Sequence, residues 1–539
     1  MTEAADLSTP ATNNAAPAYA SRRTFAIISH PDAGKTTLTE QLLLAGGAIH
    51  LAGRIRSKGG GRATRSDWME IEQKRGISVT SSVMTFERGP ITYNLLDTPG
   101  HADFSEDTYR TLTAVDSAVM VLDAAKGIES QTRKLFEVCR LRDIPIITFI
   151  NKVDREGLDP LALMDEIADT LALDVTPVTW PIGMGVDYRG FLDLIRGRMV
   201  LPDGSEGPLA FREPEDIVLP PELAADPIFV QAVEGLTLAR AALPRFDIEA
   251  FRAGMLTPVF FGSALKGLGV PELLDGIATW SPPPQPQPAE PAPIRPDQNE
   301  VTGFVFKVQA NMDPNHRDRV AFMRLCSGTF RRGMKLRHVR TGKDITIANP
   351  VLFMARDRET ADEAVAGDIV GVPNHGTLSV GDTLTERSTV SFTGIPDFAP
   401  EILRRVRPVD VMRSKQLSNG LHDLAEEGVA QMFKPHIGNA WIVGVIGDLQ
   451  LEVLSSRLAN EYGTEITMEP SGADSARWVA SEDAMKLKAF VAANRSSVAE
   501  DRAGAPVYLA PNRWTLDRTQ KDWPDIRFLT TRERAHTLA

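Results

Sequence analysis

A short stretch near the N-terminal end of the sequence combines the residue types that bind phosphate. Residues 29–36 read SHPDAGKT and directly follow the apolar run 25–28. The next residues place Leu38, Leu42 and Leu43 on one face of a helix. A loop between a strand and a helix aims backbone N–H groups and the positive end of the helix dipole at one point, where a phosphate group binds. The stretch therefore predicts a phosphate-binding loop.

Two side chains of this loop have the chemistry for a nucleotide and its metal ion. Lys35 would reach the β- and γ-phosphates, and the Thr36 hydroxyl would hold Mg²⁺. The usual pattern begins with glycine, and Ser29 stands in that position, but serine is small enough to keep the turn. We expect the whole loop to bind nucleotide, with the residues Ser29, His30, Pro31, Asp32, Ala33, Gly34, Lys35 and Thr36.

A second polar loop follows the apolar run 95–96. It contains Asp97, Thr98, Pro99, Gly100 and His101. The Asp97 carboxylate would reach the metal ion through a water molecule. Ligands of open α/β sheets bind outside the carboxyl ends of the strands, so we expect this loop to lie beside the phosphate-binding loop.

Two more loops carry groups that match guanine. The loop after residues 146–150 contains Asn151, Lys152, Val153 and Asp154, and the loop after residues 259–261 contains Ser263, Ala264 and Leu265. The Asp154 carboxylate can accept both N1–H and N2–H of guanine, and adenine offers no such pair. Backbone N–H groups of the last loop would meet the guanine O6. Four loops in this order predict a GTPase that binds GTP and GDP with Mg²⁺.

Between the first two loops lies a basic, glycine-rich segment, residues 51–75. Its charged residues surround a triple glycine and are Arg54, Arg56, Lys58, Arg62 and Arg65. We expect it to be mobile when free and to act as a switch that the γ-phosphate and its metal ion order. A hydroxyl group just after this segment would complete the coordination shell of the Mg²⁺ ion. Ser78 is the expected ligand, and Thr80 is the alternative, because an alternating strand would place both on one face.

Composition limits the class of protein. The chain has 539 residues, which predicts two to four domains. A net charge of −12 argues against a protein that coats nucleic acid through a general positive field. Cys139 and Cys326 lie in apolar patterns, which excludes a disulfide framework and predicts buried thiols. No apolar run approaches the ~18–20 residues of a membrane span and no signal pattern begins the chain, so we expect a cytoplasmic protein.

The first domain is expected at residues 21–280, after a disordered tail at residues 1–20. Strands and helices alternate in it, which predicts an α/β fold with a doubly wound parallel sheet. Strands are expected at 79–86, 92–96 and 117–122, and helices at 104–114, 131–140 and 270–280. A stretch at about 183–254, rich in Pro, Gly and acidic residues, indicates an inserted subdomain.

Two further domains are expected after a proline-rich segment. Residues 281–299 contain a proline at nearly every second or third place, which predicts a semi-rigid polyproline linker. Short strands separated by glycine turns predict a small β-barrel at 300–389. Residues 390–539 return to mixed structure and predict an α+β sandwich. Its helices are expected at 415–427 and 449–462, and its strands at 441–447 and 465–468.

Five runs of sequence carry a resemblance to a known family. They are SRRTFAIISHPDAGKTTLTEQ, SDWMEIEQKRGISVTSSVM, DTPGHADFSEDTYRTLTAVD, FKVQANMDPNHRDRVAFMR and IVGVIGDLQLEVLSSRLANEYG. With these runs the chain resembles the translational GTPases that work on the ribosome and, within them, the class II peptide-chain release factors. The resemblance covers nearly everything from Ser21 onward. Ser29 in place of glycine and Ser78 in place of the usual threonine look like features of this group.

The resemblance implies a function and several residue roles. It implies binding to the ribosome, both RNA and proteins, after a stop codon has been read, and ejection of a class I release factor. No DNA or membrane partner is expected, and the protein should be a monomer. The resemblance also implies that His101 orients the attacking water opposite the γ-phosphate, behind an apolar gate of Pro31 and Ile77. Arg62 or Arg65 could instead act as an arginine finger, which the family does not support.

Two rival functions remain for comparison. A translocase of the elongation factor G type shares the first domains but continues with two more, whereas about 150 residues follow the expected barrel here, enough for one domain. A regulatory switch with a non-ribosomal partner would not need the barrel and the third domain. Sedimentation with ribosomes in the presence of a non-hydrolysable GTP analogue separates this last function from the others.

Overall fold

The computed structural model describes residues 17–49, 78–310, 319–353, 358–387, 389–438 and 440–533. The basic segment from Arg54 to Arg65, Ile77 of the expected gate, and residues 1–16 of the expected tail lie outside the described residues. The end of that tail differs from the prediction, because Ala18–Ser21 forms a short 3-10 helix, η1. The Ala18 carbonyl accepts a hydrogen bond from the Arg22 guanidinium, which ties this turn to the first strand.

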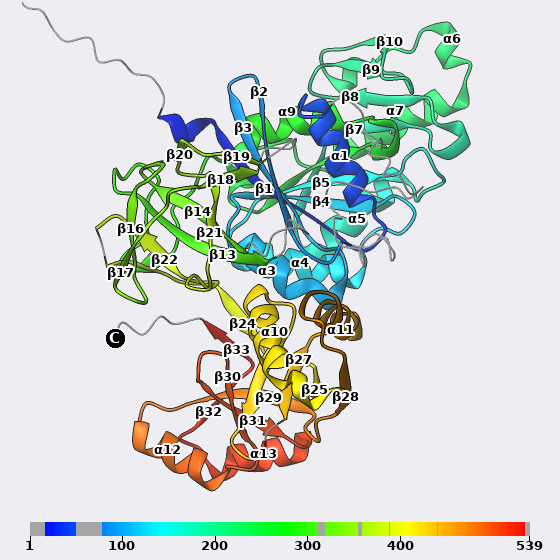
Figure 1. The fold of residues 1–539 in the computed structure, drawn as a ribbon. Helices are drawn as coiled ribbons and strands as arrows, with labels where there is room; N and C mark the ends of the chain where they lie inside the picture. Colours follow the sequence, from blue (N-terminus) through cyan, green and yellow to red (C-terminus); the bar gives the residue numbers. More distant parts are fainter. Residues whose placement is uncertain are drawn as a thin grey trace, which may run out of the picture.

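A seven-stranded mixed sheet forms the centre of the first domain (Figure 1). Its strands, in spatial order, are β2 (Ser82–Arg88), β3 (Ile91–Asp97), β1 (Arg22–Ser29), β4 (Ser117–Asp123), β5 (Ile146–Asn151), β11 (Leu256–Phe261) and β6 (Asp174–Pro177). The prediction of a wholly parallel sheet is wrong at β2, which pairs antiparallel with β3. Only Gly89 and Pro90 separate these two strands, and a connection that short can join only antiparallel neighbours. β2 also begins at Ser82, later than expected.

Helices cover both faces of this sheet. The helices are α1 (Lys35–Ala45), α3 (Ser105–Leu112), α4 (Ser130–Leu141), α5 (Pro160–Leu171) and α9 (Val270–Trp280). Successive residues of a strand point to opposite faces. Phe25 and Ile27 accordingly pack into the core beneath α1 and α9, and Ala26 and Ile28 pack into the core beneath α4 and α5.

A smaller antiparallel sheet lies between β6 and β11 in the sequence. It contains β7 (Thr179–Ile182), β8 (Gly190–Asp193), β9 (Arg198–Val200) and β10 (Glu206–Ala210). Three helices follow it, α6 (Pro221–Ala224), α7 (Pro227–Ala242) and α8 (Ile248–Arg252). This is the region where the composition indicated an inserted subdomain, although its first strand begins at Thr179 and α8 packs on β11 of the main sheet.

The proline-rich segment does not form a free polyproline spacer. Its strand β12 (Ala289–Glu290) pairs with β23 (Ser391–Phe392), and Gln287 and Ile294 exchange two backbone hydrogen bonds of 2.9 Å. The Gln285 N–H also donates to the Asp116 carboxylate at 2.9 Å. The segment is therefore docked on neighbouring parts of the chain, because its non-proline residues supply the backbone donors that the prolines lack.

An eight-stranded antiparallel sheet forms a half-barrel after this segment. Its strands, in spatial order, are β17 (Lys343–Thr346), β16 (Lys335–His338), β22 (Thr383–Thr385), β13 (Thr302–Ala310), β14 (Arg319–Ser327), β21 (Ile369–Pro373), β18 (Val351–Phe353) and β19 (Arg358–Thr360). The short pair β15 (Thr329–Arg331) and β20 (Glu363–Val365) lies beside it. The edge strands β17 and β19 do not pair with each other, so the sheet stays open.

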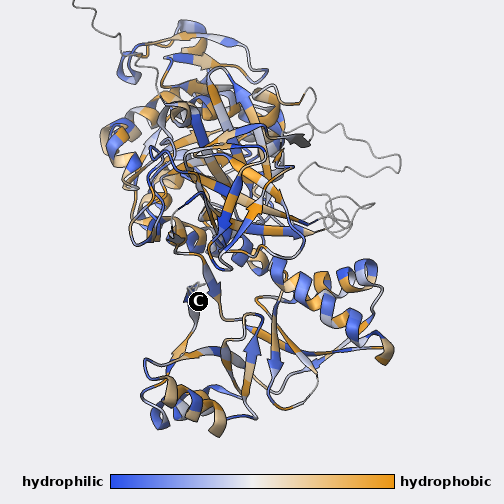
Figure 2. Ribbon diagram, turned by 60° about the vertical axis from the view of Figure 1, so that its left-hand side comes forward, coloured by the Kyte–Doolittle hydropathy of each residue, from blue (hydrophilic) through white to orange (hydrophobic). Residues whose placement is uncertain are grey.

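The C-terminal domain has a second eight-stranded antiparallel sheet, with helices over both halves. Its strands are β28 (Ile466–Pro470), β25 (Ile402–Pro408), β27 (Trp441–Val445), β26 (Gln431–Pro435), β30 (Val498–Asp501), β31 (Pro506–Ala510), β29 (Ser475–Ala480) and β32 (Arg527–Leu529). The helices are α10 (Ser414–Glu427), α11 (Asp448–Tyr462), α12 (Ala484–Ala493) and α13 (Arg513–Asp522). Figure 2 shows hydrophobic and hydrophilic residues along the same helices, as expected for helices that pack on a sheet. The predicted order of an α/β domain, a β-barrel-like domain and an α+β domain is confirmed.

The structure also bears on the predictions about the two cysteines and about membrane spans. Cys139 and Cys326 are buried free thiols, as expected, and burial raises the pKa of the Cys139 thiol to about 12. Within the described ranges, no helix has both the length and the hydrophobicity that a membrane span requires.

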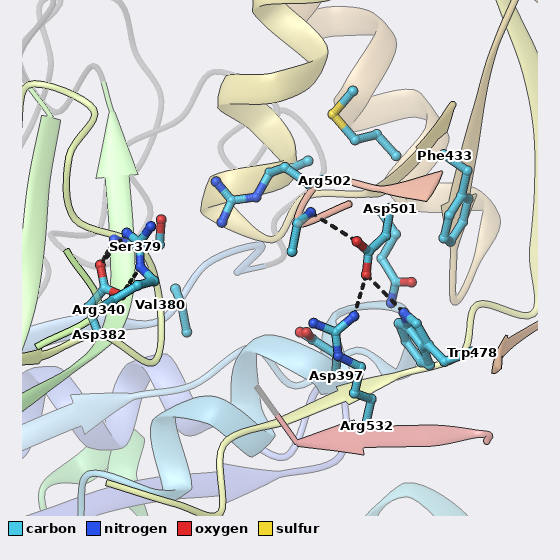
Figure 3. A pocket seen from close by; sticks show the side chains of 14 residues that line it. Arg340, Ser379, Val380, Asp382, Asp397, Phe433, Trp478, Asp501, Arg502 and Arg532 are labelled. Carbon is cyan, nitrogen blue, oxygen red and sulfur yellow. Dashed lines mark hydrogen bonds and ion pairs between the residues drawn. The ribbon is translucent and has the colours of Figure 1, made fainter. Parts of the chain in front are cut away.

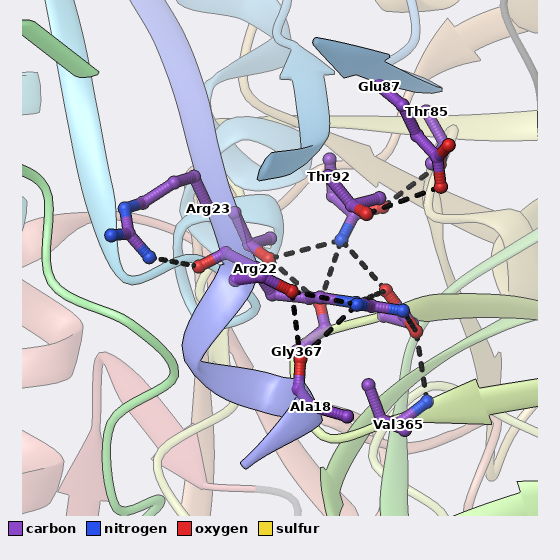
Figure 4. Close-up of polar contacts among 12 residues, drawn as sticks. Ala18, Arg22, Arg23, Thr85, Glu87, Thr92, Val365 and Gly367 are labelled. Atoms are coloured by element: carbon purple, nitrogen blue, oxygen red, sulfur yellow. Dashed lines mark hydrogen bonds and ion pairs between the residues drawn. The ribbon is translucent and has the colours of Figure 1, made fainter. Parts of the chain in front are cut away.

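A buried polar junction joins the first domain to the half-barrel (Figure 4). The Gly367 carbonyl accepts hydrogen bonds from Thr24 Oγ1 at 2.7 Å and from Arg324 Nη1 at 2.6 Å. The same guanidinium forms an ion pair with Asp116 at 2.5 Å, and both side chains are only 1% exposed. Breaking such a pair by removing one partner leaves an uncompensated buried charge.

We predict that Arg324→Met destabilises the protein by about 3–5 kcal/mol, because Asp116 then stays buried without its counter-charge. The double variant D116N/R324M should be more stable than R324M, since it removes the charge as well. Urea denaturation, monitored by circular dichroism, measures the free energy of unfolding of both variants. Arg331→Met is the matched control, because Arg331 is 71% exposed in its pair with Glu363 and should change stability by less than about 1 kcal/mol. Equal midpoints for R324M and R331M would contradict the assignment.

Candidate functional site

The topology brings the predicted loops to one edge of the main sheet. Strands β1, β3, β4, β5 and β11 run parallel, so all five end at the same edge. Residues that directly follow neighbouring parallel strands therefore lie close together. A cavity of about 320 Å³ opens at this edge. Its lining residues are Ser29, His30, Pro31, Asp32, Gly34, Lys35, Thr36, Thr37, Ser78, Gly100, His101, Lys152 and Arg155.

The loop after β1 forms one wall of this cavity. Helix α1 begins at Lys35, and its N-cap residue Gly34 has no side chain with which to cap the first turn. The first N–H groups of a helix have no partner within the helix. They are thus available to a ligand at the cavity. Gly34 has a φ of +94°, and a Cβ built on it would lie 2.3 Å from Nδ2 of Asn151, so the position requires glycine.

A buried ion pair joins this loop to the loop after β3. Lys35 Nζ lies 2.5 Å from Oδ1 of Asp97, and the Asp97 side chain is 1% exposed. In that second loop Gly100 and His101 line the cavity, whereas Thr98 donates to the Ile27 carbonyl at 2.7 Å and stays buried. Pro99 accepts a hydrogen bond from Thr108 at 3.2 Å through its carbonyl. Thr98 and Pro99 therefore hold the loop and do not face the cavity.

His30 has an additional partner outside the loop. Its buried ring places Nδ1 3.4 Å from Oγ1 of Thr132 in α4. Burial lowers the pKa of His30, which favours the neutral imidazole. The side chain therefore packs between the phosphate-binding loop and α4 while it lines the cavity.

Asn151 ties three loops together. Its Nδ2 donates to the Ala33 carbonyl at 2.7 Å, and its Oδ1 accepts from the Lys152 and Ala264 N–H groups, each at 2.8 Å. Ser263 Oγ donates to Asp154 Oδ1 at 2.5 Å, which fixes the carboxylate expected to meet guanine. Of the residues expected at the base, Lys152 alone lines the cavity. The residues that do not line it are Asn151, Val153, Asp154, Ser263, Ala264 and Leu265.

Asp123 is a site residue that the sequence reasoning missed. It ends β4, and its Oδ2 accepts from Lys152 Nζ at 2.7 Å, while that ammonium group also donates to the Asp32 carbonyl at 2.5 Å. Burial opposes ionisation of Asp123, but hydrogen bonds from Lys152 and from the Ala125 N–H outweigh it and hold the pKa of the carboxyl below its usual value. Its place at the end of an apolar strand was the available signal. Thr37 and Arg155, which line the cavity, were missed too.

The residues expected at a metal ion supply suitable donors. The hydroxyls of Thr36 and Ser78 and the Asp97 carboxylate are hard oxygen ligands, the type that Mg²⁺ prefers. Thr36 and Ser78 line the cavity, and Asp97 lies beneath it against Lys35. Within the described part of the chain, no group of three or more His, Cys, Asp or Glu is placed to hold a metal ion.

The two alternatives for the hydroxyl ligand differ in position. Because β2 begins only at Ser82, residues 78 and 80 do not lie on one face of a strand as the alternation argument required. Ser78 lines the cavity and Thr80 does not.

Comparison with known families identifies the chain. Residues 20–283 match the elongation factor Tu GTP binding domain, and residues 300–387 match elongation factor G domain 2. Residues 392–520 match the C-terminal domain of the class II release factor RF3. The chain belongs to the RF3 family of class II release factors. It is therefore a GTPase of translation termination, and the predicted family, function class and enzyme class are confirmed.

A solved structure shares this arrangement. A protein of Thermus thermophilus superimposes with a TM-score of 0.66 at 25% sequence identity, and the match covers 83% of this chain and 67% of that one. The domain that directly follows the half-barrel is an RF3-type C-terminal domain. This argues against the rival function of a translocase of the elongation factor G type.

We predict that Gly34→Ala weakens GTP binding at least roughly tenfold, the equivalent of about 1.4 kcal/mol. A methyl group there would displace Asn151, which holds the phosphate-binding loop and the base loops together. Fluorescence titration with a labelled guanine nucleotide measures the affinity. Gly254→Ala is the matched control, since Gly254 also has a positive φ, +70°, but no atom within 4 Å of its would-be Cβ. Similar affinities for G34A and G254A would show that the clash is harmless.

Proposed function

We propose that this RF3-family GTPase binds GTP with Mg²⁺ in the 320 Å³ cavity, docks on the ribosome after peptide release, and promotes departure of the class I release factor. GTP hydrolysis then releases the GTPase itself. The observation that carries the proposal is the RF3 C-terminal domain joined to a domain whose phosphate and base loops meet at one sheet edge. We also propose that the protein acts as a monomer in the cytoplasm, without a DNA or membrane partner.

The phosphate groups would lie on the N-terminus of α1. The N–H groups of its first turn and the helix dipole favour an anion there, and Lys35 adds a positive charge. Lys35 is held by Asp97, so it is oriented before any nucleotide enters. Thr36 and Ser78 would hold Mg²⁺ directly and Asp97 through water, and the ion supplies neutralisation of phosphate charge.

Guanine would be selected by the loops that Asn151 holds. The Asp154 carboxylate is oriented by Ser263 and would accept both guanine donors, and the Ser263–Leu265 segment would present backbone N–H groups to O6. The Lys152 side chain, fixed between Asp32 and Asp123, would cover one face of the base.

Hydrolysis needs one placed water molecule. Its oxygen bonds to the γ-phosphorus as the bond to the β–γ bridging oxygen breaks, so the electron pair stays on GDP and the proton of the water passes to the released phosphate. His101 lines the cavity and is the group proposed to orient that water. Pro31 lines the cavity too and would form one side of the proposed gate.

We predict that His101→Ala reduces ribosome-stimulated GTP hydrolysis by roughly a hundredfold or more and leaves GTP affinity within a few-fold. The reason is that His101 would touch the attacking water and not the nucleotide. Single-turnover hydrolysis with ribosomes and nucleotide titration separate the two quantities. His436→Ala is the control, because His436 pairs with Glu500 in the C-terminal domain. Equal losses of affinity and rate would assign His101 a structural role.

The termination function is tested on stop-codon complexes that carry a fluorescently labelled class I release factor. The protein with GTP should speed dissociation of that factor, and it should not release the peptide itself, because no motif of the sequence supplies water to an ester at the peptidyl centre. The G34A variant serves as the control with impaired nucleotide binding. Unchanged dissociation together with faster movement of transfer RNA would overturn the proposal in favour of a translocase.

A further inference from the structure

The helix that follows His101 has a charged face buried between the domains. His101 caps η2 (Ala102–Phe104), which leads directly into α3. Asp103, Asp107 and Arg110 are four and three residues apart, so they lie on one side of this helical stretch. Such a face usually points to solvent. Here Asp107 and Arg110 meet the half-barrel and the C-terminal domain, and Asp103 meets α11.

Asp103 supplies the N-terminal cap of a helix in the C-terminal domain. The N-cap residue of α11 is Gly447, which has no side chain. Asp103 Oδ2 accepts the N–H of Leu449, the second residue of α11, at 2.9 Å. This is the bond that an N-cap side chain normally makes. A Cβ on Gly447 would lie 2.0 Å from Cγ of Asp103, so only glycine permits this approach.

The same carboxylate group contacts His101. His101 Nδ1 accepts a hydrogen bond from the Asp103 backbone N–H at 3.2 Å, and Asp103 Oδ1 lies 3.1 Å from the same nitrogen. The His101 side chain is 33% exposed. The Nδ1 edge of the ring is therefore held by both the backbone and the side chain of Asp103.

Helix α3 itself is anchored to the half-barrel. Asp107 Oδ2 accepts from the Ser81 N–H at 2.6 Å and from Ser81 Oγ at 2.7 Å. Lys307 of β13, 3% exposed, donates to the Ser81 carbonyl and lies 3.4 Å from Asp107. Burial opposes the charge of Asp107, but Lys307 and Ser81 outweigh it and keep the pKa of that carboxyl below its usual value. Helix α3 is thus held by the half-barrel through Asp107 and by the C-terminal domain through Arg110, which pairs with Asp397 at 3.2 Å.

The C-terminal domain meets the half-barrel through polar contacts of α10: Arg319 of β14 pairs with Glu426 at 3.3 Å, and Ser379 Oγ donates to Glu426 Oε1 at 3.1 Å. A pocket of about 520 Å³ lies between the two domains (Figure 3). On one wall Arg340 pairs with Asp382 at 2.6 Å, and on the other Arg532 pairs with Asp501 at 2.7 Å. Each of these two pairs lies within one domain, whereas Ser379, which also lines the pocket, reaches Glu426 of the other domain. Movement of the C-terminal domain away from the half-barrel would have to break the contacts of Glu426 with Ser379 and Arg319.

We propose that Asp103 is a positioning residue through which the docked C-terminal domain restrains His101, and that withdrawal of α11 frees the histidine for hydrolysis. This inference rests on the proposed role of His101 in orienting water. It links the position of α11 to the rate of GTP hydrolysis.

The test is single-turnover GTP hydrolysis without ribosomes, at saturating nucleotide. Gly447→Ala places a methyl group against Asp103, and Asp103→Ala removes the cap. Both variants should hydrolyse GTP roughly five- to tenfold faster than the unaltered protein, the size of a modest coupling, with GTP affinity within twofold. Asp103→Asn should stay near the unaltered rate, because its amide oxygen still accepts the Leu449 N–H.

Combining each cap variant with His101→Ala shows whether the cap acts through His101. If the cap acts through His101, G447A/H101A and D103A/H101A should each match H101A alone, whereas an independent change in the site would add to it. Lys486→Met, which breaks an exposed pair with Asp525, is the control and should leave the rate unchanged. Rates at or below the unaltered value for D103A, or an increase that persists without His101, would overturn the inference.

Failure of the proposed function would be recognised separately. If H101A keeps full ribosome-stimulated hydrolysis, the role of His101 is wrong whatever the cap variants do. If H101A loses that activity while D103A and G447A leave the ribosome-free rate unchanged, the restraint alone is wrong. If G447A fails to fold, as judged by its thermal melting profile, the ribosome-free hydrolysis rate of D103A alone tests the restraint.

Discussion

The arrangement of the first two domains depends on one buried carbonyl group. Gly367 accepts hydrogen bonds from Thr24, Asn94 and Arg324, and Arg324 also neutralises Asp116. A buried carbonyl and a buried charge both need partners, so these groups allow one geometry and oppose others. Because the half-barrel is held this way, Lys307 reaches Ser81, three residues beyond Ser78. The expected metal ligand is thus placed partly by a neighbouring domain.

The cavity combines strong local restraint with open access. Lys35, Asn151 and Lys152 each join separate loops through short hydrogen bonds, so the walls are set before a ligand binds. Preorganised charges of this kind lower the reorganisation that a reaction requires. His101 is different, because its partner Asp103 also caps a helix of another domain. The rigid loops suit nucleotide binding, and the adjustable His101 suits control of when GTP is hydrolysed.

The sequence predicted the loops better than the connections between them. Lys35, Asp97 and Asn151 follow apolar strands, and parallel strands must bring such residues to one edge, so local pattern sufficed. The antiparallel direction of β2 depended on the two-residue turn at Gly89, a signal that was present but not used. The docking of the proline-rich segment depended on Asp116 and Ser391, distant residues that no local pattern reveals. Likewise, nothing in the spacing of Asp103 and Gly447 shows that one caps the helix of the other.

The burial of both thiols has a practical consequence for experiments on single molecules. Maleimide dyes react with the thiolate, and burial keeps Cys139 and Cys326 protonated at neutral pH and out of reach of reagents in solution. A cysteine introduced at an exposed position, such as Met485 in α12, would therefore be labelled without removal of the native ones. A second label at Leu141, at the end of α4, would complete a donor and acceptor pair between the first and last domains. Energy transfer between them would then report any change in the separation of the first and last domains in real time.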